Sequence, residues 1–283
     1  MHALPLLFAF AAGAILATPL LRALSEGGHT KLNYRGRALP CPFGVLALAA
    51  ALLALIPLTL LERLGSGDVF EPAALPVAVY ALGVLALGLV DDTLARERPG
   101  ETGSPAQRGW RGHGSAALRG ELSTGALKAV GSLGLALFAM SYLGLSDGRW
   151  LLAAGVLVLA TNVFNLLDLR PGRSAKAFVV LGLGLSLGST DLRPLWAIGL
   201  FAAPALIAGS FDLRERAMLG DTGANLLGAL AGLWLVLTLS GVGQLIALAL
   251  LAAITLYGEL RSISALVERV PVLRELDSWG RPS

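Results

Sequence analysis

The sequence predicts an all-α protein, a polytopic bundle of transmembrane helices. Of its 283 residues, 55% are hydrophobic and 14% are charged, and the mean hydropathy is +0.72. A soluble domain carries about 25% charged residues. The apolar runs are too long and too rich in Leu, Ala and Gly to be barrel strands. One cysteine, Cys41, rules out an intrachain disulfide.

Nine apolar segments are expected to span the membrane, with ten as the alternative count. No basic residue precedes the first run, which therefore resembles a spanning helix more than a cleaved signal. The sixth and seventh segments are the shortest, below the roughly 20 residues that a spanning helix needs. The nine expected ranges are 3–22, 43–61, 73–90, 124–145, 150–167, 175–189, 194–210, 222–240 and 243–260.

The distribution of positive charge predicts the orientation of these spans. All but three of the 22 Lys and Arg residues lie beyond alternate spans, on one face; the exceptions are Arg63, Arg149 and Arg193. Cytoplasmic loops carry such an excess, so we expect the N-terminus outside and the C-terminus inside. This bias is typical of a bacterial inner membrane. Topology also explains the pI of about 9.3, so no nucleic-acid partner is expected.

Two regions are predicted, a transmembrane domain over 1–262 and a tail over 263–283. Apolar tail residues recur at helical spacing between Arg and Glu: Ile263, Leu266, Val267, Val270, Leu273 and Leu276. Such an amphipathic helix lies in the membrane interface or packs on the bundle. Pro271 is expected to kink it.

Four polar clusters fall on the predicted cytoplasmic face, and the first is the basic loop 31–40, with Lys31 and Asn33. Topology alone explains the charges of this loop. The functional alternative is a basic loop that neutralises phosphate.

The second cluster is the adjacent pair Asp91 and Asp92 at the end of the third span. Ionisable groups at a membrane boundary are costly and usually functional. The two carboxylates could ligate a divalent cation or handle a proton, or each could pair with a nearby Arg for structural reasons. In the segment that follows, His113 taken alone is a structural or solvated residue.

The third cluster places Asn162, Asn165 and Asp168 three residues apart on one helical stripe. Hydrogen bonding between helices is the structural alternative for such a stripe. The fourth cluster centres on Asp221, just before the eighth span and flanked by glycines. A helix N-terminus favours anions, although Asp221 could also be a simple N-cap.

Taken together, the clusters gather four aspartates beside Lys, Arg and Asn at one membrane face. Carboxylates hold Mg²⁺, bases neutralise phosphate oxygens and amides orient a polar ligand. This inventory indicates a Mg²⁺-dependent reaction of a phosphate ester.

The ordered clusters resemble the motifs of the polyprenyl-phosphate N-acetylhexosamine-1-phosphate transferases, a family that serves peptidoglycan and other cell-envelope glycans. The resemblance extends from Lys31 to Gly228. The motifs that carry it are KLNYRGRALP, GLVDD, RGHGSAALRGELSTGALKAVG, NVFNLLD and MLGDTGANLLG.

The resemblance implies transfer of a phospho-sugar from a nucleotide sugar, expected to be a UDP-sugar, to polyprenyl (undecaprenyl) phosphate. It implies that Asp221 ligates Mg²⁺, with Mn²⁺ as the alternative ion, and that Asp91 and Asp92 bind or deprotonate the lipid phosphate. Asp168 would complete the catalytic set. It also makes a homodimer plausible. The expected substrate-binding residues are Lys31, Asn33, Asn162, Asn165, Arg170, Lys176 and Arg214.

Three departures from the family pattern leave rival interpretations open. Pro171 stands where the family commonly has a second Asp, and no His lies in a late cytoplasmic loop. The stretch from Phe211 to Arg216, before Asp221, lacks the Asn that the family often has there. Arg170, Arg173, Lys176, Arg214 and Arg216 are candidates to replace the lost phosphate contacts. One rival is an inactive relative that binds polyprenyl phosphate or a nucleotide in cell-envelope assembly. The other is a transporter that uses the carboxylates as ion or proton relays.

Overall fold

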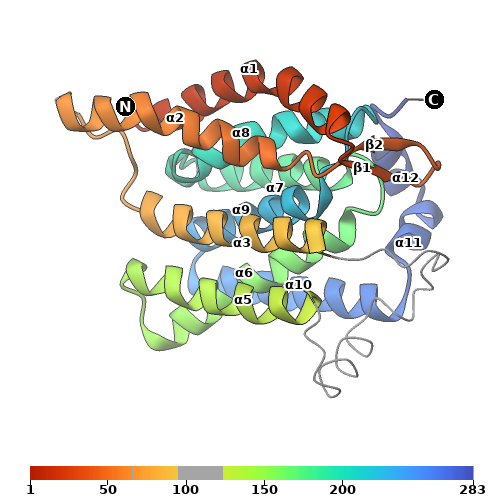
Figure 1. Ribbon diagram of the computed structural model, residues 1–283. Helices are drawn as coiled ribbons and strands as arrows, with labels where there is room; N and C mark the ends of the chain where they lie inside the picture. The colour runs from red at the N-terminus through yellow and green to blue at the C-terminus, as the bar shows by residue number, and fades with distance from the viewer. Residues whose placement is uncertain (66, 95–123, 283) are drawn as a thin grey trace.

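The computed structural model is a bundle of roughly parallel and antiparallel helices, drawn in Figure 1, and it describes residues 1–65, 67–94 and 124–282. Helix makes up 78% of the structure and strand 2%, which confirms the all-α class. The two termini lie toward opposite ends of the bundle (Figure 1).

A helix lies at each of the nine predicted ranges within the described residues. Eight of these segments are long and apolar enough to cross a membrane, so the protein is a multi-pass helical membrane protein. The exception is α7, whose 17 residues fall short of the usual span. The helices are α1 (Leu4–Glu26), α2 (Val45–Leu64), α3 (Ala74–Leu94), α5 (Thr124–Met140, continued by the 3-10 turn Ser141–Leu143), α6 (Asp147–Leu167), α7 (Arg173–Ser189), α8 (Arg193–Leu213), α9 (Gly220–Thr238) and α10 (Gly241–Leu260).

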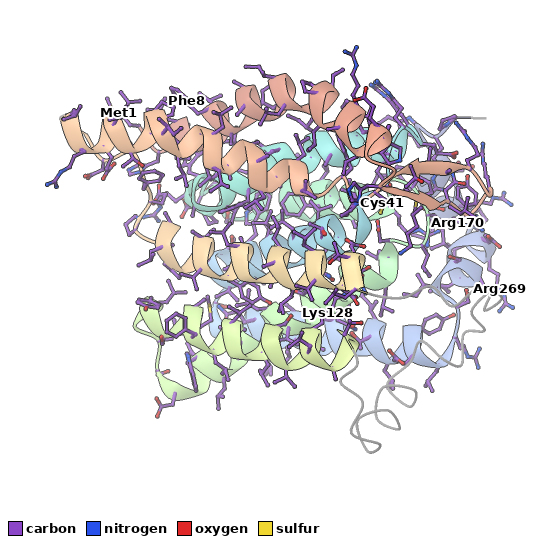
Figure 2. The ribbon with its side chains drawn as sticks, viewed as in Figure 1. Met1, Phe8, Cys41, Lys128, Arg170 and Arg269 are labelled. Atoms are coloured by element: carbon purple, nitrogen blue, oxygen red, sulfur yellow. The ribbon has the colours of Figure 1, made fainter. Side chains whose placement is uncertain are left out.

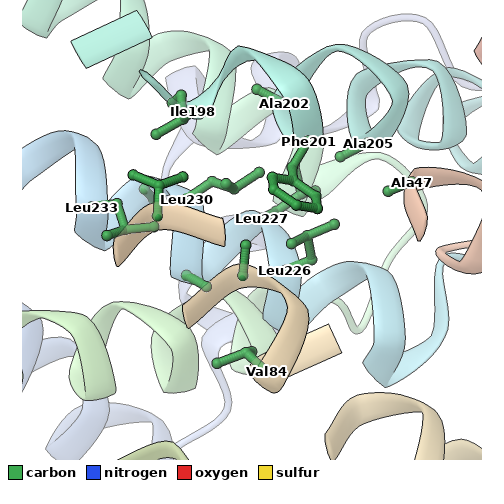
Figure 3. Close-up of a cluster of buried hydrophobic side chains, with 14 of the residues drawn as sticks. Ala47, Val84, Ile198, Phe201, Ala202, Ala205, Leu226, Leu227, Leu230 and Leu233 are labelled. Carbon is green, nitrogen blue, oxygen red and sulfur yellow. The ribbon is translucent and has the colours of Figure 1, made fainter. Parts of the chain in front are cut away.

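Helix α9 forms the centre of the bundle. It contacts α3, α6, α7 and α8, and nearly all of its residues are buried. Its leucines interdigitate with side chains of α8, α3 and α2 (Figure 3), and the residues labelled in this cluster are Ala47, Val84, Ile198, Phe201, Ala202, Ala205, Leu226, Leu227, Leu230 and Leu233. An element held on so many sides is a rigid support for its first residues, which carry Asp221.

Glycines let the neighbouring helices approach the α9 backbone closely. A methyl group added at Gly88 of α3 would lie 2.7 Å from the carbonyl oxygen of Asp221. One added at Gly228 of α9 would lie 2.6 Å from the Cα of Thr161 on α6. Side chains larger than hydrogen do not fit at either crossing. The start of α9 is therefore fixed against the ends of α3 and α6.

A short antiparallel hairpin joins α1 to α2 at the end of the bundle that carries the polar clusters. Its strands are β1 (Thr30–Leu32) and β2 (Ala38–Pro40), with Lys31 opposite Leu39. The N–H of Met218 donates to the carbonyl of Pro40 at 2.9 Å. The hairpin is thus attached to the turn between α8 and α9.

The tail forms two short helices, α11 (Ile263–Arg269) and α12 (Pro271–Ser278), and not one continuous helix. The break at Pro271 confirms the expected kink. Asp277 of α12 holds two guanidiniums: it accepts from Arg173 Nε at 2.8 Å and from Arg281 Nη2 at 2.7 Å. The tail is therefore docked on the start of α7 by ion pairs. Whether it also lies in the membrane interface stays a prediction.

Candidate functional site

The four polar clusters lie at one end of the bundle. Figure 2 shows Lys128, Cys41 and Arg170 toward this end, whereas Met1 and Phe8 lie toward the other. Elements far apart in the chain meet here: the hairpin, the ends of α3, α6 and α8, and the starts of α5, α7 and α9. Below, this region is called the polar end.

Asp92, at the end of α3, caps the N-terminus of α9. Its Oδ1 accepts from the N–H of Asp221 at 3.1 Å, and its Oδ2 accepts from the N–H and the hydroxyl of Thr222 at 2.8 and 2.7 Å. A carboxylate at this position satisfies free N–H groups and complements the helix dipole. Both oxygens are engaged, so Asp92 fixes the place of Asp221.

Lys128 lies between the other two aspartates of this region. Its ammonium donates to Asp91 Oδ2 at 3.3 Å and also to Asp221 Oδ2. The side chains of Lys128 and Asp91 are each 16% exposed and that of Asp221 is 35% exposed, so the charge cluster is open on the side of Asp221. The sequence analysis treated Lys128 only as a topological charge. Its position inside an otherwise apolar helix was the available signal, because lone charges in spans are usually functional.

Asp91 and Asp221 can bind a Mg²⁺ ion only if water and substrate phosphates supply its other ligands. No three His, Cys, Asp or Glu side chains form a metal-ligand set within the described part of the chain. Asp91 and Asp221 nevertheless converge on a single cationic group. Mg²⁺ commonly uses one or two carboxylates and fills its other positions with waters and substrate phosphates. The pair therefore suits an ion that arrives with a phosphate ligand.

Beside this cluster is a small cleft, with a cavity volume of about 40 Å³. The residues that line it come from the hairpin, the α6–α7 loop and the α8–α9 turn: Asn33, Tyr34, Leu39, Asp168, Leu169, Arg170, Pro171, Asp212, Ala217 and Met218. Burial raises the pKa of Asp168 well above its ordinary value, and the neighbouring carboxylates of Asp212 and Asp221 raise it further. The cleft thus contains a carboxyl group that is easily protonated, next to the Arg170 guanidinium.

Asp212, which the sequence analysis did not select, connects two loops of the site. Its buried carboxylate accepts from the N–H of Gly172 at 2.6 Å and from the N–H of Leu219 at 3.3 Å. It thereby joins the loop that follows Asp168 to the residues that precede Asp221. Nothing local in the sequence indicated this role, because both partners are backbone groups brought close by the fold.

Glu215, in the α8–α9 turn, was also missed. It is 2% exposed and accepts from Asn33 Nδ2 at 3.3 Å and from the Tyr34 hydroxyl at 3.1 Å. Two guanidiniums lie beside it, with Arg37 Nη1 at 3.3 Å and Arg35 Nε at 3.5 Å. An acidic residue between two arginines is typical of a solvated loop, so no local pattern indicated that Glu215 is buried.

Three other predicted residues lie at or beside the cleft. Lys31 is exposed on β1. Asn33 is buried, and its Oδ1 accepts from the N–H groups of Arg35 and Arg37, both at 2.9 Å, which shapes the hairpin turn. The Arg170 guanidinium lies 4.4 Å from the centre of the Tyr34 ring, a cation–π contact.

The remaining predicted binding residues are placed elsewhere. Asn162 donates to the Thr255 hydroxyl on α10 at 3.3 Å, which is the structural alternative for that residue. Asn165 is half-buried and is not among the residues that line the cleft. Lys176 donates to the carbonyls of Leu276 and Asp277 in the tail, at 3.0 and 2.7 Å. Arg214 is exposed. The stripe of Asn162, Asn165 and Asp168 therefore does not form one site, because Asn162 contacts α10 whereas Asp168 lines the cleft.

His113 and most of the segment RGHGSAALRGELSTGALKAVG lie outside the described residues, which resume at Thr124. No protein-family model matches the chain, and no curated protein matches it.

Proposed function

We propose that this membrane protein transfers a phospho-sugar from a nucleotide diphosphate sugar to a polyprenyl phosphate at the cytoplasmic face of the inner membrane. An oxygen of the lipid phosphate attacks the phosphorus that bears the sugar. The bond from that phosphorus to the oxygen of the nucleoside monophosphate breaks. The products are a polyprenyl-diphospho-sugar and the nucleoside monophosphate.

One observation carries the proposal: Asp91 and Asp221 converge on one cation position, at the N-terminus of α9 and beside a cleft that contains Asp168 and Arg170. A reaction between two phosphate esters needs positive charge, a helix N-terminus and fixed geometry more than it needs a covalent group from the protein. The polar end offers all three, and the ordered motifs of the sequence agree with it.

The roles of the chain's own residues follow from their surroundings. Asp221 and Asp91 would hold Mg²⁺, which supplies charge neutralisation at the diphosphate. Asp92 keeps Asp221 in place through the α9 cap. Lys128 would meet a phosphate oxygen, and Arg170 and Asn33, which line the cleft, would contact the nucleotide. Asp91 contacts Lys128, Thr124 and Asp221 but does not cap α9, so we assign it, and not Asp92, to orient the lipid phosphate.

The test is release of nucleoside monophosphate by the purified protein with undecaprenyl phosphate, Mg²⁺ and a panel of UDP-sugars. Asp221→Asn should lower the rate at least about a hundredfold, the usual effect of removing one preorganised electrostatic group. Asp191→Asn changes a carboxylate at the other end of the bundle that is 38% exposed and paired with Arg193; this variant is the control and should keep the wild-type rate. Silence of the folded wild-type protein across the panel would reject the proposal.

A second candidate is a relative that binds polyprenyl phosphate or a nucleotide without catalysis. It is favoured by the full engagement of Asp92 and by the lack of a three-residue ligand set among the described side chains. Under this alternative, Asp221→Ala would retain biological function in a complementation assay, which a Mg²⁺-dependent enzyme should not do.

A further inference from the structure

Glu215 has two features that a residue in an ordinary connecting turn does not need. Its carboxylate is fully buried, with a side-chain exposure of 0%. Its backbone has φ = 50°, in the left-handed region that residues other than glycine rarely adopt. Backbone in this region is strained for a residue with a side chain and persists where the surroundings require it. The turn is therefore built to present this carboxylate inward.

Among the residues that the structure describes, the side-chain partners of Glu215 belong to the hairpin. Asn33 and Tyr34 donate hydrogen bonds to it, and the guanidiniums of Arg35 and Arg37 lie within 3.5 Å. The hairpin has little other cover, because most of residues 30–38 are exposed. Glu215 thus gathers the polar side chains of the hairpin turn. The hairpin is also held by the Met218 N–H on the Pro40 carbonyl, at 2.9 Å, and by Arg35 Nη2 on the Pro282 carbonyl, at 3.2 Å.

The attachment also shapes the cleft. Asn33 and Tyr34 line one side of it and Arg170 and Asp168 line another, and the Tyr34 ring supports the Arg170 guanidinium. A hairpin that swung away from Glu215 would carry Asn33 and Tyr34 out of the cleft and remove that support. By holding the hairpin in place, Glu215 therefore also determines the width of the cleft.

We propose that Glu215 is a positioning residue that holds the hairpin closed over the cleft, so that its basic and amide groups meet a bound phosphate ester. It touches no reacting atom. The identity of the ligand rests on the proposed function, whereas the closure of the hairpin does not.

The chain contains a native reporter of this closure. Cys41, its single cysteine, directly follows β2 and is 7% exposed. Burial raises the pKa of its thiol to about 12, so alkylation by a maleimide at neutral pH should be slow while the hairpin is closed. An opened hairpin exposes the thiol and speeds the reaction without any need for substrate.

The experiment compares Cys41 labelling in the full-length protein and in three variants. Glu215→Gln removes the charge that holds Arg35 and Arg37, and should speed labelling about tenfold, since hydrogen bonds to a charged group are worth about 1.5–3 kcal/mol. Glu215→Asp keeps the charge on a shorter side chain and should fall between wild type and Glu215→Gln. Glu26→Gln, at an exposed position near the same end, should label at the wild-type rate.

Measurements of KM and kcat then distinguish a positioning role of Glu215 from a purely structural one. Glu215→Gln should raise the KM for the nucleotide sugar about tenfold with little change in kcat, because binding geometry is lost and the reacting groups remain. Asp221→Asn should do the reverse, abolishing turnover while Cys41 labels at the wild-type rate.

Each outcome decides a different question. Wild-type labelling in folded Glu215→Gln would overturn the proposal, as would faster labelling with an unchanged KM. An inactive wild-type protein would reject the proposed function, and the labelling rates would still test the hairpin attachment.

Discussion

The aspartates of the polar end share one side-chain chemistry, and their partners assign them different tasks. Asp92 is occupied by the N-terminus of α9, and Asp212 is occupied by two backbone N–H groups. Asp91 and Asp221 share the ammonium of Lys128. Within the described part of the chain, Asp168 accepts one long hydrogen bond, from the Ser174 hydroxyl at 3.4 Å. The less engaged carboxylates are the ones open to a ligand.

At the residue scale, Asp168 should make stability depend on pH. Its pKa is raised in the folded protein, so folding favours the protonated acid. The stabilising effect is complete below the ordinary value of 3.8 and is lost as the pH rises through the folded value. Asp168→Asn should therefore be more stable than wild type at neutral pH and equally stable in acid, as measured by thermal unfolding in detergent. A difference that grew toward low pH would contradict this.

How far the sequence predicted the site also depends on the residue. Asp91, Asp92, Asp168 and Asp221 could be selected because carboxylates at the ends of apolar runs are conspicuous. Glu215 and Asp212 could not, because their partners lie more than 35 residues away in the sequence or are backbone groups. Asn162 was selected for its spacing, but its partner on α10 depends on a packing that one helical stripe does not reveal.

Among the helices, the sequence predicted where each one lies more reliably than where it begins and ends. Each long apolar run is a helix, since length and hydropathy suffice to define it. The tail was harder: its apolar spacing predicted one amphipathic helix, whereas Pro271 starts a second one. Its docking depends on a long-range pair, Arg173 with Asp277, that no local pattern contains.

The tail should come loose when Asp277 is replaced. Asp277→Ala leaves the buried guanidinium of Arg173 without its partner, a loss of about 3–5 kcal/mol for a buried pair. Limited proteolysis after residue 260 should become at least tenfold faster. Glu275→Ala, an exposed position on the same helix, should leave the rate unchanged.

The docking of the tail should also resist moderate acid. The guanidiniums of Arg173 and Arg281 lower the pKa of Asp277 to about 2, against 3.8 for an ordinary carboxyl. Its contribution is therefore present above 3.8 and is lost only as the pH falls toward 2. Proteolysis of the tail at a rate that already rises between about pH 7 and pH 5 would contradict the pairing.

At the scale of the whole molecule, the bundle has its charged loops and cleft at one end, and its orientation stays a prediction from the distribution of Lys and Arg. Fusions to a reporter that is active only outside the cell should be active after Ser146 and Ser240 and inactive after Arg170. A fusion after Asp191 tests whether α7, with 17 residues, carries the chain across. The reporter is expected to be active in this fusion. An inactive reporter would mean that α7 does not cross the membrane, so that the chain crosses it eight times.

The close crossings of α9 at Gly88 and Gly228 have a consequence for how the protein tolerates change. At both positions the nearest neighbouring atoms belong to the backbone and cannot move aside for a larger side chain. In a saturation mutagenesis library selected for function, glycine should therefore be the residue recovered at both positions. The lipid-facing positions of α1, α5 and α10, by contrast, need only remain apolar. Few substitutions should therefore be tolerated at the close contacts of α9, and many on the outer faces of the peripheral helices.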